Sequence, residues 1–279
     1  MAVARLPQPV LLGVGGALAW LLRPWLAERR RIAAINLALC FPDREAAWRQ
    51  DLLAAQMRSS AIGLLELLRA WYAPAARVRA LGDVEGLDHL RTALARGQGV
   101  LLLTGHFPQT ELAARVLVEA FGRPIRAVVR RHNSPCLEAW LERSRHRAFG
   151  PTLAKKDVRS LLRALQAGEP VVYSADQDFS YQNAFVPFFG VLASTLITTP
   201  EVIRRTGAVA LPFWCHRDEW GRYHVRIDAP WSGWPSADPV ADAAVYLRAL
   251  EQEVRRHPEQ YLWLHRRFKT RPAGEPAVY

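Results

Sequence analysis

The stretch VLLLTGHFPQTE, residues 100–111, indicates the fold class of this chain. It opens with a short apolar run, Val100–Thr104, of the kind that suits a strand buried on both faces of a sheet. A helix is predicted to follow over Glu111–Phe121. In open α/β sheets, ligands bind beyond the carboxyl ends of the strands. His106 comes directly after the predicted strand, so we expect it to lie at a functional edge of the sheet.

The alternation of strands and helices continues on both sides of this stretch. Strands are predicted over residues 125–129, 170–175, 208–214 and 222–227, and helices over residues 87–95, 133–147, 158–167, 198–206 and 238–256. Such alternation predicts an α/β fold with a mixed, mostly parallel central sheet that is flanked by helices.

The N-terminal part has a different pattern. Residues 10–22, VLLGVGGALAWLL, form an uninterrupted apolar run that is shorter than the roughly 20 residues of a spanning helix. Trp20, Trp25 and the cluster Arg29–Arg31 bound this run. The arrangement indicates a helical membrane anchor, either shallow or marginally spanning, with the arginines at the cytoplasmic face. An ordinary buried core helix is the alternative.

The charge balance favours an anionic partner. There are 37 Lys and Arg residues against 26 Asp and Glu, which gives a net charge of +11. Nucleic acid, an acidic lipid surface or a phosphorylated substrate would each suit such a chain. No RNA-binding or zinc-finger motif is present, so nucleic-acid binding is the less favoured class. The three cysteines are far apart and lack metal-ligand spacing, so no metal site is predicted.

His106 and Glu111 form an H-x4-E pattern. A carboxylate near an imidazole would fix its tautomer and stabilise its charged form. The histidine could then remove a proton from a hydroxyl that attacks a thioester. No serine or cysteine stands beside them at an elbow position, so we infer direct transfer without a covalent acyl-enzyme. By itself the pattern is weak, because a glutamate is also favoured at a helix N-terminus by the helix dipole.

Several ordered sequence blocks resemble one enzyme family. The segment from Gly105 to Leu112 looks like the H-x4-(D/E) block of glycerolipid-type acyltransferases. Further blocks resemble those of the late (secondary) lauroyl/myristoyl acyltransferases of lipid A biosynthesis. These blocks are NLALCFP (36–42), KDVR (156–159), DQD (176–178), FVPFFG (185–190) and YLWLHRRFKTRP (261–272). The resemblance covers roughly residues 29–272.

This resemblance implies an O-acyltransferase of the bacterial inner membrane. It would move a fatty acyl group from acyl carrier protein, or from acyl-CoA, to a hydroxyl of a lipid A precursor. Neither a metal nor a further cofactor is implied, and the catalytic domain would face the cytoplasm. We expect an N-terminal hydrophobic anchor over residues 1–28, an acyltransferase domain over residues 29–272 and a frayed tail over residues 273–279.

The resemblance also implies four catalytic residues. His106 would be the general base, and Glu111 would orient and polarise it. Arg145 would stabilise the developing oxyanion or bind a phosphate, unless it is only a solvated charge on a helix face. Asp176 would line the site and hold Arg145 or the sugar.

Substrate binding is expected from six further polar residues. They are Arg130, Arg131, Asp178, Arg266, Arg267 and Lys269. The family has a proline where Arg131 stands, so either Arg130 or Arg131 could hold a phosphate. The block FVPFFG is interpreted either as the wall of an acyl tunnel or as plain core packing.

Two alternatives to lipid A acylation stay open at this point. The same chemistry could act on another lipid, such as a phosphatidylinositol mannoside, or on a specialised metabolite. The chain could also be a catalytically silent membrane scaffold, although the intact His106 and Glu111 pair argues against that.

Overall fold

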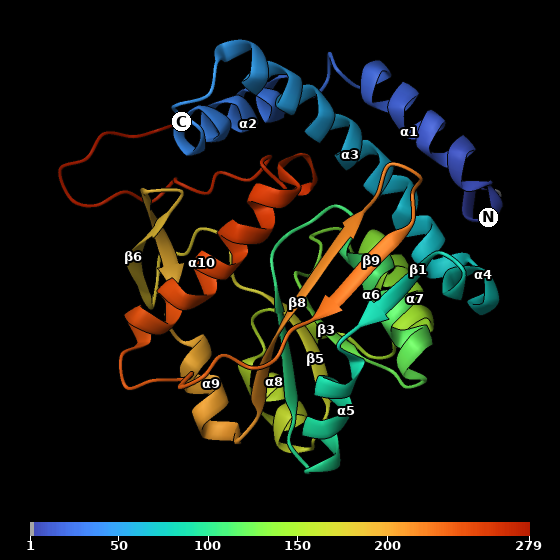
Figure 1. The fold of residues 1–279 in the computed structure, drawn as a ribbon, viewed down its shortest axis with the longest axis vertical. Helices are drawn as coiled ribbons and strands as arrows, with labels where there is room; N and C mark the ends of the chain where they lie inside the picture. Colours follow the sequence, from blue (N-terminus) through green and yellow to red (C-terminus); the bar gives the residue numbers. More distant parts are fainter. Residues whose placement is uncertain (1–2) are drawn as a thin grey trace.

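A seven-stranded sheet forms the centre of the protein, as Figure 1 shows for a computed structural model that describes residues 3–279. The strand order is β1-β9-β8-β2-β5-β3-β4, and all neighbours are parallel except the antiparallel pair β8 and β9. The strands are β1 (Gly82–Glu85), β2 (Val100–Thr104), β3 (Arg126–Val129), β4 (Leu153–Ala154), β5 (Pro170–Ser174), β8 (Val209–Arg217) and β9 (Tyr223–Ile227). The predicted mixed, mostly parallel α/β sheet is therefore confirmed.

Strand β2 lies in the middle of the sheet, between β8 and β5, and each of its five residues is buried. This explains its apolar sequence, because a strand covered on both faces has no solvent-facing side. The helices around the sheet are α4 (Ala75–Arg79), α5 (Leu87–Ala95), α6 (Thr110–Phe121), α7 (Pro135–Phe149), α8 (Val158–Gln166), α9 (Thr199–Thr206) and α10 (Pro239–Arg256).

The three longer helices that come before the sheet along the chain are α1 (Gln8–Leu21), α2 (Ala27–Cys40) and α3 (Ala46–Tyr72). Helix α1 packs along α3, and Figure 1 shows the two side by side. Leu11 is fully buried between them, and a Cβ atom at Gly15 would come within 2.5 Å of Ile62. Within residues 3–279, no helix combines the length and the hydropathy that crossing a membrane requires.

The block FVPFFG forms part of a separate hairpin that the sequence analysis did not predict. Strands β6 (Asn183–Phe188) and β7 (Val191–Leu196) pair antiparallel. Phe188 and Phe189 are buried, and the Phe189 ring lies 5.8 Å from the Trp263 ring and 5.0 Å from the Phe41 ring. These two phenylalanines are therefore core residues, which was the alternative interpretation of the block.

The C-terminal segment follows α10 and a short 3-10 helix (Pro258–Gln260) back toward α2. Asn36 of α2 donates hydrogen bonds to the carbonyl oxygens of Trp263 (2.7 Å) and His265 (2.8 Å). Tyr279 bonds through its hydroxyl to the side chain of Asn36 and to the backbone N–H of Phe268. The last residue of the expected frayed tail is thus tied to the domain.

Candidate active site

The register of the sheet brings His106 and Asp176 together. Strands β2 and β5 are parallel neighbours, and Thr104 pairs with Ser174 at their carboxyl ends. His106 and Asp176 each come two residues beyond these paired positions. Two residues that stand 70 positions apart along the chain therefore meet at one edge of the sheet.

His106 and Asp176 form a hydrogen-bonded dyad. The Nδ1 atom of His106 lies 2.5 Å from Oδ1 of Asp176, and the backbone N–H of His106 donates to Oδ2 at 2.9 Å. The hydroxyl of Tyr261 also donates to Oδ2, at 2.9 Å. Burial acts to raise the pKa of Asp176, but the charge and hydrogen bonds of His106 and the bond from Tyr261 outweigh it and hold this pKa well below its usual range. Asp176 is thus a buried carboxylate that fixes the imidazole.

Glu111 does not take the role that the sequence analysis gave it. It lies in the first turn of α6, and its carboxylate faces α3 and α7 instead of the imidazole. The indole N–H of Trp71 donates to Oε2 at 2.6 Å, and Arg145 donates to Oε1 from Nη2 (2.6 Å) and Nε (3.0 Å). Within residues 3–279, the carboxylate hydrogen bonded to His106 is Asp176. The expectation that Glu111 orients His106, and that Asp176 holds Arg145, is therefore wrong.

His106, Glu111 and Arg145 nevertheless line one cavity of about 350 Å³. The remaining wall is mostly apolar and comes from α3, the loop after β2, α6, β3, α7 and β5. Its apolar members include Leu67, Phe107, Ala114, Ile125, Val128, Phe149 and Val172. The His106 side chain is 33 % exposed and that of Arg145 is 16 % exposed, so both can meet a ligand there. Such a site can hold an apolar chain beside a base and a cation.

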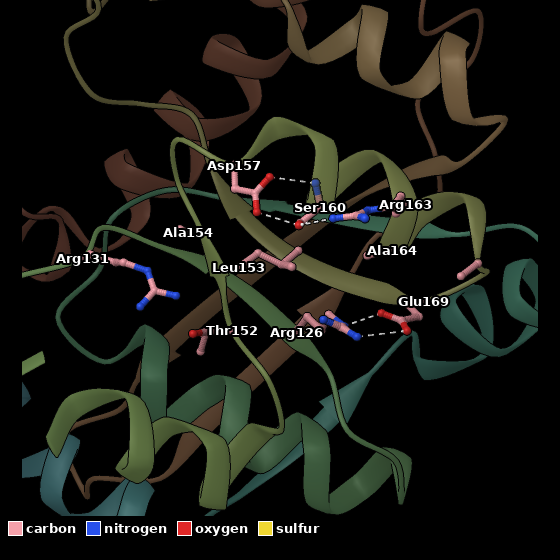
Figure 2. Close-up of a pocket in the computed structure, with 11 residues that line it drawn as sticks. Arg126, Arg131, Thr152, Leu153, Ala154, Asp157, Ser160, Arg163, Ala164 and Glu169 are labelled. Carbon is pink, nitrogen blue, oxygen red and sulfur yellow. Dashed lines mark hydrogen bonds and ion pairs between the residues drawn. The ribbon is translucent and has the colours of Figure 1, made fainter. Parts of the chain in front are cut away.

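The structure separates Arg130 from Arg131. Arg130 lines the same cavity as His106. Arg131 lies in a different, open hollow of about 420 Å³ beside β4 and α8, as Figure 2 shows. Its guanidinium is 3.5 Å from Glu142 and 3.8 Å from Glu138. Of the two arginines, Arg130 is therefore the one placed to meet a ligand of His106.

Two of the expected substrate-binding residues have structural partners instead. Arg267 is 3 % exposed and donates to the carbonyl oxygen of Ser194 at 2.7 Å. Asp178 accepts from the N–H and the hydroxyl of Thr270, at 3.0 and 2.9 Å. Arg267 also donates to the carbonyl oxygen of Gln177 at 3.3 Å, so both side chains join the loop after β5 to the C-terminal segment. Their polar groups therefore have protein partners where substrate contacts were expected.

Arg266 and Lys269 lie on the surface of the same segment. Arg266 donates to Glu28 near the start of α2, at 2.6 Å, and its side chain is 44 % exposed. Lys269 is exposed as well. These two residues stay candidates for an anionic surface and not for the cavity of His106.

Four residues of the site were not singled out in the sequence: Trp71, Lys155, Gln177 and Tyr261. Three of them belong to or border the blocks that carried the resemblance, so block membership was the available signal. Trp71 lies at the end of α3 and had no such signal. Only the packing of α3 against α6 brings its indole to Glu111.

Comparison with known proteins identifies the family of the chain. A model of the family described as bacterial lipid A biosynthesis acyltransferase matches residues 1–270. The chain is 37 % identical to the lipid A biosynthesis palmitoleoyltransferase of Escherichia coli K12 over 278 residues, which cover 99 % of this chain and 90 % of that protein. It is 35 % identical to the lipid A biosynthesis lauroyltransferase of the same organism, over 99 % of this chain and 91 % of that protein.

More distant relatives carry the same description. The lipid A biosynthesis myristoyltransferase of Escherichia coli K12 is 24 % identical over 90 % of this chain and 78 % of that protein. These matches confirm the expected enzyme class, an O-acyltransferase of the lipid A secondary type. The chain belongs to the bacterial lipid A biosynthesis acyltransferase family.

Proposed function

We propose that this protein transfers a fatty acyl group from an acyl thioester to a hydroxyl of a lipid A precursor, with His106 as general base and Asp176 as its partner. The donor would be acyl carrier protein or acyl-CoA. The observation that carries the proposal is the His106 and Asp176 dyad, which faces a mostly apolar cavity at the carboxyl edge of the sheet.

The proposed reaction is a direct displacement. The ring nitrogen of His106 that does not face Asp176, Nε2, takes the proton of the acceptor hydroxyl while the oxygen attacks the thioester carbonyl. The new C–O bond forms and the C–S bond breaks, and the proton on His106 passes to the departing thiolate. Asp176 stabilises the transient imidazolium because its buried carboxylate keeps its charge.

Arg145, which lines the same cavity, would support this reaction. Its guanidinium is the cation that could meet the negative charge that develops on the carbonyl oxygen, or a phosphate of the acceptor. The two-point bond from Arg145 to Glu111, together with the Trp71 bond, fixes the guanidinium in place. Glu111 would therefore act as a positioning residue for Arg145.

The proposed substrates match the surroundings of the dyad. Apolar side chains of the cavity would contact acyl chains, and Arg130 would contact a phosphate of the anionic glycolipid. The net charge of +11 suits an acidic carrier protein and an anionic membrane surface.

We also propose that the protein lies on the cytoplasmic face of the inner membrane through helix α1. The face of α1 that turns away from α3 exposes Val10, Val14 and Leu21. Trp20 and Trp25 are 76 % and 75 % exposed at the end of this helix and in the turn that follows. Tryptophans beside apolar residues and an arginine cluster are typical of helices that lie in the membrane interface.

Replacement of the proposed base tests the function. The purified His106→Ala variant would be assayed for acyl transfer from acyl carrier protein to a Kdo-lipid A precursor. We expect turnover to fall roughly 10²–10⁴-fold, which is the usual contribution of a general base. The control is His132→Ala, which removes an exposed histidine outside the cavity. Undiminished turnover of His106→Ala would overturn the mechanism. Transfer by the wild type to a different lipid only would overturn the proposed acceptor.

A further inference from the structure

Gln177 lies against the nitrogen of His106 that the proposed reaction needs. Its side-chain Nε2 is 3.1 Å from His106 Nε2, on the side of the ring opposite Asp176. Its other amide atom, Oε1, accepts a hydrogen bond from Nζ of Lys155 at 3.3 Å. Lys155, Gln177 and His106 are therefore joined by successive polar contacts that run from the end of β4 to the imidazole.

Lys155 decides which way the amide of Gln177 points. A lysine ammonium has donors only, so it can bond the amide oxygen and not the NH₂ group. The NH₂ group must then face His106. An NH₂ donor needs an acceptor, and a ring nitrogen accepts only when it carries no proton. This arrangement therefore requires the proton of the neutral ring to sit on Nδ1, where Asp176 accepts it.

Lys155 is itself held in place by the protein. Its backbone N–H donates to the carbonyl oxygen of Val129 at 2.8 Å, which extends the pairing of β3 and β4. Its ammonium lies 4.7 Å from the centre of the Phe179 ring. A half-buried lysine on a fixed backbone is a defined anchor for the amide, unlike a mobile surface lysine.

Asp176 and Gln177 act on the imidazole in opposite directions. The carboxylate of Asp176 favours a doubly protonated, charged ring, which cannot accept another proton. The NH₂ group of Gln177 disfavours that form, because two donors would then face each other. The amide also occupies the place where an acceptor hydroxyl must sit. Arrival of the hydroxyl would displace the amide and leave Asp176 to stabilise the charge that forms on the ring.

We propose that Lys155 and Gln177 are positioning residues which keep His106 neutral and ready to accept a proton until the acceptor hydroxyl displaces the Gln177 amide. The kinetic consequence rests on the proposed function, but the protonation state of the ring does not. The other charged or titratable groups around this ring are Glu111, Arg130 and Arg145, which line the same cavity, and Tyr261, His265 and Arg267 of the C-terminal segment.

Nitrogen NMR of the full-length protein in detergent tests the proposal without any substrate. The protein would be labelled with ¹⁵N-histidine, and the His106→Ala variant would identify the His106 signals. At pH 7 we expect a neutral ring with its proton on Nδ1. In Lys155→Met the amide is free to turn, its oxygen can face the ring, and we expect the charged form to increase. Lys155→Arg keeps a donor-only cation and should preserve the wild-type signals.

Lys156→Met is the matched control, because it removes the same charge one residue further along, from an exposed side chain. It should leave the His106 signals unchanged. Gln177→Glu offers only acceptors to the ring and should give the charged form at pH 7. A wild-type ring protonated on Nε2, or unchanged signals in both Lys155→Met and Gln177→Glu, would overturn the proposal.

Steady-state kinetics provides the second measurement. We expect kcat of Lys155→Met to fall roughly two- to tenfold at pH 7, the range that the loss of one hydrogen bond gives, with KM little changed. The difference in kcat between Lys155→Met and the wild type should shrink as the pH rises, because a higher pH restores the neutral ring of His106 in the variant. A deficit that is the same at all pH values would indicate a merely structural role and overturn the proposal. If the wild type transfers no acyl group but shows the expected signals, only the proposed function fails.

Discussion

At the residue scale, the site separates two carboxylates that a sequence pattern would assign to one task. Asp176 is 2 % exposed and bonds the imidazole of His106, whereas Glu111 bonds Arg145 and Trp71. The H-x4-E spacing predicted a pair, but spacing along a chain does not say where a helix directs its first-turn side chains. Replacing Asp176 should therefore act through His106, whereas replacing Glu111 should act through Arg145.

The first prediction concerns Asp176→Asn. An amide can present its NH₂ group to Nδ1 of His106, so the proton of the ring would move to Nε2 and the base would be lost. We expect kcat/KM for acyl transfer to fall roughly 10²–10⁴-fold, close to the loss in His106→Ala. Asp88→Asn, at a side chain that is 90 % exposed, is the control. Near-normal activity of Asp176→Asn would contradict the role assigned to this carboxylate.

The second prediction concerns the coupling of Glu111 and Arg145. If Glu111 acts by holding the guanidinium, Glu111→Gln and Arg145→Ala should not have additive effects on kcat. We expect the double variant to be about as slow as Arg145→Ala alone, because residues in one hydrogen-bond network are coupled. The rates of the wild type, both single variants and the double variant give the coupling energy. Additive losses would instead mean that Glu111 acts on another group.

At the scale of elements, the close approach of α3 to the loop after β2 supports the site. Gly63 of α3 faces Pro108, and a Cβ atom there would lie 2.6 Å from the Cβ of Pro108. Pro108 stands between His106 and Glu111 in the sequence, so a shift of this loop would disturb both halves of the site. The cavity can therefore keep its shape only because Gly63 has no side chain that would push this loop away.

The third prediction follows from this contact. Gly63→Val should lower the free energy of unfolding by about 1–3 kcal/mol, the usual cost of overpacking, and should also reduce acyl transfer. Gly13→Ala on α1 is the matched control, because nothing lies within 4 Å of its added Cβ. That variant should gain about 0.5–1 kcal/mol, since alanine is the better residue in a helix. Denaturant unfolding measures both, and full stability of Gly63→Val would show that the loop can move away without cost.

The fourth prediction concerns helix α1 and the membrane. Replacing Trp20 and Trp25 with serine should weaken binding to vesicles of phosphatidylethanolamine and phosphatidylglycerol at least roughly tenfold, since burial of one large apolar side chain contributes about 1.5–3 kcal/mol. The melting temperature should hardly change, because both side chains are exposed. Trp220→Ser removes a tryptophan that is 77 % exposed in the turn between β8 and β9 and serves as the control. An equal loss of vesicle binding in Trp220→Ser and in the variant of Trp20 and Trp25 would argue against α1 as the part that contacts the membrane.

At the scale of the whole molecule, a stack of three histidines joins the β8–β9 hairpin to the end of α10. The His216 ring lies 4.6 Å from that of His224 and 4.1 Å from that of His257, nearly parallel to both. Burial, together with the neighbouring His257 and His224, lowers the pKa of His216 to about 4. Burial also lowers the pKa of His257. The folded protein therefore favours uncharged rings at His216 and His257.

The fifth prediction is a loss of stability in mild acid. As the pH falls below 6.5, the histidine at 216 takes up a proton in the unfolded chain before it does so in the folded protein, so its contribution declines between pH 6.5 and about 4. Melting temperatures across this window should fall less steeply for His216→Phe, which keeps a stacked ring that does not titrate. His89→Phe, at an exposed position, should follow the wild type. If the melting temperatures of the wild type, His216→Phe and His89→Phe fell equally with pH, His216 would not be the source of the acid sensitivity.

Much of the architecture could be predicted from the sequence, because each part has a local cause. Apolar runs such as Val100–Thr104 and the helical periods between them predicted the α/β class, and the structure confirms a mostly parallel sheet. The hairpin of β6 and β7 was missed, since its residues 183–196 carry few alternating positions and a phenylalanine-rich block that fits a core or a tunnel equally well.

The chain by itself determined the family, the strand that ends shortly before His106 and the helix that begins near Glu111, since these depend on local order and short-range periodicity. Only the tertiary structure decided which carboxylate serves the base. The parallel pairing of β2 with β5 brings Asp176 to His106, and the packing of α3 and α7 draws Glu111 to Trp71 and Arg145. The physical reason is that hydrogen bonds form between neighbours in space, and residues 70 positions apart become neighbours only through the register of the sheet.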